Sequence, residues 1–419
     1  MGKNILASFQ WMVFILAGTI VTPVSIAFAF HFSQQETAEL LQRTLFIMGL
    51  TSLLQGYFGH KLPLMEGPAG LWWAVFLTYA TISGQAASSV HEILISLEFG
   101  LLTAGVIVIL LSVLNLIKYV KKLFTPTMTG LYLLLLVVQL SGPFIQGILG
   151  VEGGQLNGKV AAGAIATLLL AIILSRLNVA FLRNYSVLIS LIFGWLLFYL
   201  LGISPQPTAS DQVVSLPRVL AWGIPHFNLS IFITSVLISL LLVTNLIASM
   251  DVVRQVVDPG KKISLNKAGL MMGISQLLAG LFSSVGGVAI SGSAGFIKTT
   301  RIKERLPFLI GSLLILLMSF FPGLTGLFAA IPPSVGYATL FVSISSIVGL
   351  ALQTLRPSIL EEGKLTVISL AFMTGAGMLL LPGGVLDALP ESVSSLLSNG
   401  LVIGVVFGII LEQTISHKQ

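Results

Sequence analysis

The chain has 419 residues, of which 55% are hydrophobic and 9% are charged, and its mean hydropathy is +1.01. A soluble domain carries about 25% charged residues, so this composition excludes a soluble globular protein and indicates an integral membrane protein. The absence of cysteine excludes disulfides and thiolate chemistry. The net charge of +6 comes from cations in short loops between apolar stretches, which excludes a nucleic-acid-binding face.

A helix needs about 20 apolar residues to cross about 30 Å of hydrocarbon. Fourteen segments of the chain are candidates for membrane helices, and the third and tenth of them are too short to cross alone. The first seven lie at 10–30, 41–59, 68–82, 93–117, 126–149, 158–176 and 184–202. The second seven lie at 229–254, 264–282, 292–304, 306–328, 332–353, 363–380 and 395–414.

The longest polar break, residues 204–228, is rich in proline and divides the chain into a first half, 1–203, and a second half, 229–419. An odd number of spans reverses the direction of a second copy across the membrane, so seven plus seven spans predict an inverted repeat. We therefore expect an all-α polytopic membrane protein with 14 transmembrane helices.

The charged residues support this count. If the N-terminus is cytoplasmic, all of the 21 Lys and Arg residues except Arg43, Lys159 and Arg218 fall on or near the cytoplasmic side. A wrong span count would scramble this partition, so the positive-inside bias predicts that both termini are cytoplasmic. We expect a multi-pass protein of the inner (plasma) membrane.

Two interrupted spans indicate a transporter. Residues 285–301, VGGVAISGSAGFIKTTR, combine glycines, small polar residues and cations inside an apolar region, and residues 61–73 form a fainter copy in which 68–72 stand opposite 293–297. Backbone that is not helical must be buried within the protein at membrane depth. We therefore expect 62–67 and 286–291 to form short β-segments that pair with each other, each followed by a half-helix.

The N-terminus of a half-helix presents free N–H groups and a partial positive charge, which suit a carbonyl oxygen or an anion. Gly67, Gly70, Gly292 and Gly295 fit such a site, because a missing side chain lets a ligand approach the backbone. The alternative for each glycine is close packing of helices through small residues.

Several motifs resemble one known family. GSAGFIKTTR at 292–301 is similar to the signature of the xanthine/uracil permeases, which are nucleobase-cation symporters: Gly295, Thr300 and Arg301 match, whereas Gly292 and Ser293 do not. The segments FQWMVFILAGTIVTP, WGIPHF and MMGISQLLAGLF resemble the family's first helix, the turn before its eighth and its ninth helix. The resemblance is collinear over essentially the whole chain.

The resemblance implies a core domain of helices 1–4 and 8–11 and a gate domain of helices 5–7 and 12–14. It also implies a nucleobase bound between half-helices 3 and 10, and a homodimer formed through the gate domain. The family carries carboxylates on helix 8 and at the start of helix 10. Here the second position is Gly292, and the first falls near Asn245 or Ser249, so neither can carry a proton.

Glu66 is the carboxylate that lies in a broken segment, and an ionisable residue inside the membrane is a functional candidate by default. We expect it to contact the substrate and to bind the coupling proton. The alternatives are a structural ion pair with Lys61 or a place at the cytoplasmic edge. Asp251 is a second candidate for proton coupling, although Arg254, three residues later, can pair with it.

Asn245 and Ser249 lie four residues apart on one helix face, and we expect both to contact the substrate. Ser293 belongs to the same expected site. Trp72 can stack on a planar ring or pack in the core. Thr300 and Arg301, at the end of half-helix 10, are candidates for gating, with a solvated cytoplasmic position as the alternative for Arg301.

The five histidines are scattered without metal-ligand spacing, and the phosphate loop GxxxxGK[ST] is absent, so we expect no enzyme activity, no cofactor and no ATP-driven pumping. The sequence predicts a secondary active importer of uracil or a xanthine-like purine, coupled to protons. Sodium coupling stays open, because backbone carbonyls at broken helices can bind sodium. The alternative is an anion transporter or channel of the same fold.

Overall fold

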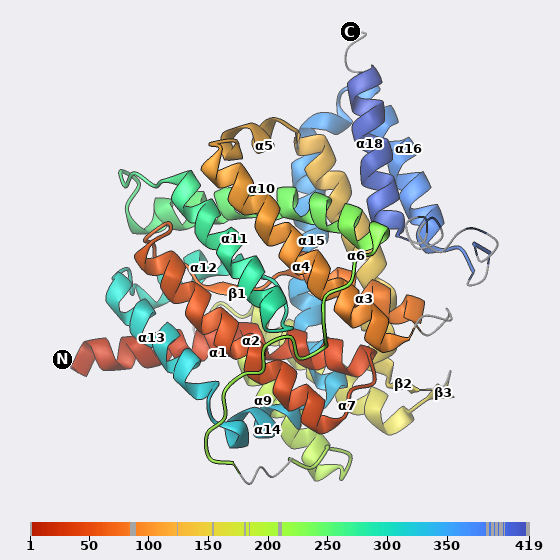
Figure 1. The fold of residues 1–419 in the computed structure, drawn as a ribbon. Coiled ribbons are helices and arrows are strands. Elements are labelled where there is room, and N and C mark those ends of the chain that lie inside the picture. The colour runs from red at the N-terminus through yellow and green to blue at the C-terminus, as the bar shows by residue number, and fades with distance from the viewer. Residues whose placement is uncertain are drawn as a thin grey trace.

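We describe the chain from a computed structural model. The structure describes residues 2–83, 89–123, 125–152, 155–179, 182–183, 185–207, 212–382, 385–386, 389, 393, 397 and 399–415. Within these ranges the chain is mostly helical, and two small pairs of strands interrupt it (Figure 1).

The first half contains long helices and one half-length helix that follows a strand. Its elements are α1 (Gly2–Ala29), α2 (Gln34–Tyr57), β1 (Glu66–Pro68), α3 (Gly70–Ser83), α4 (Val90–Val113), α5 (Ile117–Leu123), α6 (Pro126–Leu149), β2 (Val151–Glu152), β3 (Gln155–Leu156), α7 (Gly158–Arg176) and α9 (Ser186–Leu200). Strands β2 and β3 pair as a small antiparallel hairpin.

The second half repeats this pattern of a strand followed by a short helix. Its elements are α10 (Leu229–Val257), α11 (Leu265–Leu281), β4 (Gly287–Ala289), α12 (Gly292–Thr300), α13 (Arg305–Met318), α14 (Pro322–Ala329), α15 (Pro333–Ile359), α16 (Glu362–Leu379) and α18 (Gly400–Ile415).

The helices differ from the sequence prediction at two places. The span expected at 306–328 is not continuous: α13 and α14 meet at a bend of 89°. Pro322 explains the break, because proline at the first position of α14 cannot donate to an extended α13. Helix α5 was not predicted. It carries three lysines within seven residues, so it is too polar and too short to be predicted as a membrane span.

Among the described residues, six helices are long and apolar enough to cross a membrane, namely α1, α4, α6, α7, α10 and α15. The bent pair α13 and α14 adds a seventh when it is taken as one span. The chain is therefore an integral membrane protein, whereas the count of fourteen crossings stays a prediction.

Local sequence explains where the helices begin. Ser33 and Glu36 form a capping box at α2, and Ser89 and Glu92 form the same box at α4. In each box the serine side chain accepts a backbone N–H, and the glutamate accepts the N–H of the serine. Helix α6 begins with Thr125 as its cap and proline at its first position.

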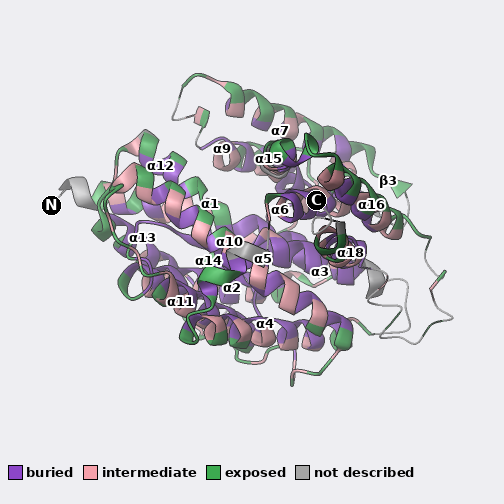
Figure 2. Cartoon of the chain, turned by 90° about the horizontal axis from the view of Figure 1, so that it is seen from above, coloured by how far each residue is buried: buried purple, intermediate pink, exposed green. Residues whose placement is uncertain are grey.

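Helix packing divides the helices into two groups. In one group α4 packs against α10 and α11, and α13 packs against α1 and α2. In the other group α6 packs against α15, α7 against α9, and α16 against α18. Figure 2 shows α2, α4, α11 and α13 on one side of the molecule and α7, α15 and α16 on the other.

Candidate functional site

Strands β1 and β4 come from opposite halves of the chain and pair near the centre of the molecule (Figure 1). They are antiparallel, with Glu66 opposite Ala289, Gly67 opposite Val288 and Pro68 opposite Gly287, and all six residues are buried. The two segments expected to be extended thus pair over three residues each. This pairing satisfies backbone groups that cannot reach water.

The hydrogen bonds that flank the strands are repeated between the halves. The N–H of Ala69 donates to the carbonyl of Gly286 at 2.8 Å, and the N–H of Ile290 donates to the carbonyl of Met65 at 3.0 Å. Ala69 therefore corresponds to Ile290. The sequence comparison paired Pro68 with Ser293, whereas the strand pairing makes Pro68 equivalent to Ala289, four positions earlier. The comparison was wrong because it matched the glycine pattern, which does not determine the strand register.

The glycines of the site have different surroundings. A side chain at Gly70 or Gly295 would meet open space, and at Gly292 it would make one ordinary contact with Ile290 at 3.5 Å. A side chain at Gly67 would collide with Ile290 at 2.8 Å. Gly67 is thus required by close packing, whereas Gly70 and Gly295 leave free space beside the N-terminal turns of α3 and α12. Close packing of helices, the alternative role for the glycines, therefore does not apply to Gly70 and Gly295.

Glu66 is fully buried, and neither of its carboxyl oxygens has a hydrogen-bond partner among the described residues. Its N–H donates to Ser52 Oγ on α2 at 3.0 Å. Residues that are opposite each other, or two apart on one strand, lie on the same face of a strand pair. Glu66 is opposite Ala289 and therefore shares a face with Gly287. A side chain added at Gly287 would meet Met48 of α2 and Ser275 of α11. Direct contact between Glu66 and a substrate beside Gly70 stays a prediction.

Ser249 and Ser293 are buried and bind the backbone of the broken segments. Ser249 Oγ lies 2.9 Å from the carbonyl of Ala289 and 2.9 Å from Oδ1 of Asn245, and it can donate to either. The N–H of Met65 donates to Ser293 Oγ at 3.2 Å. Asn245 is exposed, as are Gly292 and Gly295. Of the predicted polar contacts, Asn245 is the side chain most accessible to a ligand.

Trp72 is buried, and its indole Nε1 donates to Gln276 Oε1 at 2.8 Å. The amide of Gln276 in turn donates to the carbonyl of Gly287 at 2.6 Å. An added side chain at Gly286 would collide with the indole, so Trp72 packs against the strand connection. This arrangement matches the core-packing alternative for Trp72. Sequence reasoning missed Gln276, although a glutamine inside an apolar helix was the available signal.

Asp251 forms an ion pair with Arg254 at 3.2 Å on the partly exposed end of α10, as in the structural alternative for this residue. Thr300 Oγ1 donates to the carbonyl of Phe296 at 2.8 Å, inside α12. Arg301 is exposed and ends α12 in the left-handed conformation, with φ of 59°. Neither Thr300 nor Arg301 is joined to the strand pair by these contacts, and gating by them stays a prediction.

A small cavity lies between the two helix groups. Its accessible volume is about 10 Å³, the space of a single water molecule. Gln139 of α6 donates to Thr78 Oγ1 of α3, and Asn399 donates to Thr234 Oγ1 of α10 at 3.3 Å. These polar contacts cross the boundary between the groups and close it at this point.

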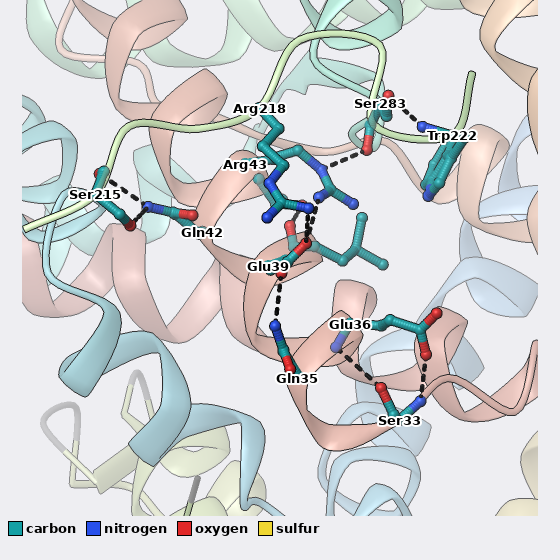
Figure 3. A network of polar contacts seen from close by, with 12 residues as sticks. Ser33, Gln35, Glu36, Glu39, Gln42, Arg43, Ser215, Arg218, Trp222 and Ser283 are labelled. Carbon is teal, nitrogen blue, oxygen red and sulfur yellow. Dashed lines mark hydrogen bonds and ion pairs between the residues drawn. The ribbon is translucent and has the colours of Figure 1, made fainter. Parts of the chain in front are cut away.

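A polar network that the sequence analysis did not predict joins α2, α4 and the connection between the halves. Figure 3 shows the part of it that lies around Arg43, Ser283 and the connection. Its members Arg43 and Glu98 are buried, and Glu98 is the charged residue in the otherwise apolar stretch 93–113 of α4. That position was the sequence signal that could have revealed Glu98.

Residues 2–384 match the model of the xanthine/uracil permease family, which is described as the Permease family. The chain belongs to this family. The protein YwdJ of Bacillus subtilis (strain 168), provisionally named a purine permease, is 39% identical over 98% of the chain and 96% of its own length. The xanthine permease of the same organism is 24% identical over 98% and 93%. The uric acid transporter UacT of Escherichia coli (strain K12) is 22% identical over 98% and 86%.

Solved structures with the same fold are membrane transporters. The transmembrane domain of the cyanobacterial bicarbonate transporter BicA has a TM-score of 0.64 at 16% identity and covers 98% of each chain. The murine anion transporter Slc26a9 has a TM-score of 0.65 at 12% identity, covering 99% of this chain and 69% of that one. These structures show the fold, while the family match and the related permeases show that the chain is a transporter and not an enzyme, as the sequence indicated.

Proposed function

We propose that this permease is a secondary active transporter that imports a nucleobase, either uracil or a xanthine-like purine, in symport with protons. The observation that carries the proposal is the junction of two half-helices, α3 and α12, through β1 and β4, with open space at Gly70 and Gly295. The named functions of the relatives, purine, xanthine and uric acid transport, support this substrate class.

The chemistry of the site suits a planar ring with carbonyl groups. The first turns of α3 and α12 present N–H donors that lack partners within their helices, and such donors bind carbonyl oxygens or a partial negative charge. Ser291 does not cap α12 through its side chain, but the N–H groups of Ser293 and Ala294 already donate to the carbonyls of Ile290 and Ser291. The donors that this proposal offers to a ligand are therefore the N–H groups of Gly70 and Leu71 at α3 and of Gly292 at α12. Asn245 adds an exposed amide on α10, which can donate to or accept from the edge of a nucleobase.

We infer fourteen crossings in two inverted halves, with both termini cytoplasmic in the plasma membrane. The packing supports an inverted repeat: α13 packs on α1 and α2 as α4 packs on α10 and α11, and α7 packs on α9 as α16 packs on α18. In this proposal the core domain comprises α1–α4 with α10–α14, and the gate domain comprises α6, α7, α9, α15, α16 and α18. A homodimer formed through the gate domain belongs to the same proposal.

Glu66 is the proposed coupling residue. Burying an unpaired carboxylate costs several kcal/mol, whereas a neutral carboxylic acid is buried far more easily. The proton on Glu66 therefore changes the energy of the strand pair on which both half-helices depend. In this proposal Glu66 acts from the α2 and α11 face, behind the substrate, and Asp251 is a structural partner of Arg254.

Uptake into proteoliposomes containing the purified permease tests this function. We expect labelled xanthine or uracil to accumulate when the outside is more acidic than the inside, and the Gly295→Val variant to be inactive. Accumulation of sulfate or bicarbonate without nucleobase transport would contradict the proposal and favour the anion-transporter alternative. Accumulation of nucleobase driven by sodium alone would support the proposed substrate but contradict proton coupling.

A further inference from the structure

Glu98 on α4 is a second fully buried carboxylate, and the proposed function makes no use of it. One carboxyl oxygen, Oε1, accepts a hydrogen bond from the hydroxyl of Ser283, and the other, Oε2, has no partner among the described residues. A buried carboxylate with one oxygen unsatisfied is costly, so a bound proton changes its energy strongly.

Ser283 connects this carboxylate to α2 and to the connection between the halves. Its carbonyl accepts from Arg43 Nε of α2 at 3.0 Å, and its hydroxyl accepts from the N–H of Trp222, in the connection between the halves, at 3.3 Å. The guanidinium of Arg43 also lies over the Trp222 ring, 5.9 Å from its centroid. Figure 3 shows Arg43, Ser283 and Trp222 converging in this way.

The network extends from Glu98 to the surface. Arg43 is only 3% exposed, but it lies 3.8 Å from the carboxylate of Glu39, which in turn lies 3.9 Å from the exposed guanidinium of Arg218. Polar groups thus continue from an exposed cation to the buried carboxylate. In the proposed topology this end of the molecule faces the outside.

The network also reaches the broken segment. Ser283 adopts the left-handed region with φ of 46°, which is unfavourable for a residue with a side chain, so its partners help to hold it there. Ser284 follows, and its hydroxyl donates to Thr44 Oγ1 at 3.2 Å. Two residues further, the carbonyl of Gly286 accepts the N–H of Ala69 at the start of α3. A change at Ser283 therefore acts on the strand pair through a short stretch of backbone.

We propose that Glu98 is an outer proton-binding site, and that its protonation is transmitted through Ser283 to the broken segment. The bound ligand is a proton from the outside water. Protonation removes the negative charge that faces Arg43 and weakens the hydrogen bond from Ser283, which loosens the turn before β4. The transmission step rests on the proposed function, whereas the proton-binding step does not.

Other ionisable groups near Glu98 are few. Those on the elements packed against it, and on α4 itself, are Glu36, Glu39 and Arg43 on α2, Tyr79 on α3, His91 and Glu92 on α4, and Arg218 and His226 on the connection, with Asp251 and Arg254 on α10 and Lys267 on α11 toward the opposite ends of their helices. The two histidines, His91 and His226, require a control in the experiment.

Trp222 reports on Glu98 without any transport assay. Intrinsic fluorescence of the purified permease is measured across about pH 4 to 9, and the signal of a Trp222→Phe variant is subtracted to isolate Trp222. We expect one transition in the wild type, its loss in Glu98→Gln, and its retention in Glu304→Gln, a matched change at an exposed carboxylate. An unchanged transition in Glu98→Gln, or its loss in His226→Gln or His91→Gln, would overturn the assignment to Glu98.

Ser283→Ala provides a second variant in case Glu98→Gln does not fold. Removing the hydroxyl takes away a donor to the carboxylate, so the Trp222 transition should move to higher pH, and an unmoved transition contradicts the proposed contact. Transmission is tested by uptake rates at varied outside pH and fixed inside pH. Glu98→Gln should lose the dependence on outside pH, and a wild-type profile in that variant would overturn transmission. If the wild type transports no nucleobase, the proposed function fails, while the fluorescence titration still decides whether Glu98 binds the proton.

Discussion

Trp72 and Gln276 join the two halves of the permease: the indole of Trp72 on α3 donates to Oε1 of Gln276 on α11 at 2.8 Å, and the amide of Gln276 donates to the carbonyl of Gly287 at 2.6 Å. One glutamine side chain therefore satisfies a half-helix of the first half and the strand of the second. These contacts hold the start of α3 against β4, where the proposed substrate site lies.

Gln276→Leu should destabilise the fold and abolish uptake. The substitution leaves the indole N–H and the Gly287 carbonyl without their partner, and each buried unsatisfied group costs about 1–3 kcal/mol. Thermal unfolding in detergent measures the first effect, and proteoliposome uptake the second. Gln353→Leu, at an exposed position of α15, is the control. Wild-type stability in Gln276→Leu would mean that these hydrogen bonds do not hold the strand pair.

Valine substitutions at Gly295 and Gly67 should affect different properties, substrate binding in the first case and stability in the second. Gly295 borders open space, so Gly295→Val should keep the stability within about 0.5 kcal/mol while it abolishes substrate binding. Gly67 lies against Ile290, so Gly67→Val should destabilise the protein by about 1–3 kcal/mol through overpacking. Thermal unfolding and equilibrium binding of labelled xanthine distinguish the two. Undiminished affinity in Gly295→Val removes the site from α12.

Gln139→Ala should favour the conformation that is open to the outside. Gln139 donates from α6 to Thr78 of α3 across the boundary of the two helix groups. Losing one such hydrogen bond, worth about 1 kcal/mol, changes a two-state population about fivefold. The chain contains no cysteine, so Leu237→Cys in the neighbouring cavity can be labelled without background. Equal labelling rates from outside, with and without Gln139→Ala, would contradict this role.

Asp251→Asn should leave proton-driven uptake within about twofold of the wild type. Asp251 pairs with Arg254 on a partly exposed helix end, and such pairs contribute about 0–1 kcal/mol. Uptake driven by a pH gradient provides the measurement. Loss of accumulation with retained exchange in this variant would move proton coupling from Glu66 to Asp251.

The sequence predicted the elements of the site better than their relative positions. Pro68, Gly67 and the pair Gly286 and Gly287 interrupt apolar spans in both halves, and this local pattern is enough to predict broken helices. The strand register depends on which backbone groups meet across the molecule. Matching glycines therefore gave the wrong partners for 68–72.

Long-range contacts explain the remaining differences. Ser249 and Ser293 bind the strand backbone, and the sequence could not distinguish this role from substrate contact, because both need a small hydroxyl at the same place. Arg43 was noticed only as an exception to the charge bias, and its partner Ser283 lies in the other half of the chain. A charged residue inside an apolar span, as Glu98 is in α4, is the sequence feature that indicates such a network.

The central claim is that this permease accumulates a nucleobase by coupling it to protons through Glu66. The most direct test compares Glu66→Gln with wild type in proteoliposomes loaded for two assays, exchange of labelled against unlabelled xanthine and accumulation under an imposed pH gradient. The account predicts that Glu66→Gln keeps exchange and loses accumulation, because glutamine cannot bind and release a proton. Accumulation at the wild-type level in Glu66→Gln would contradict it.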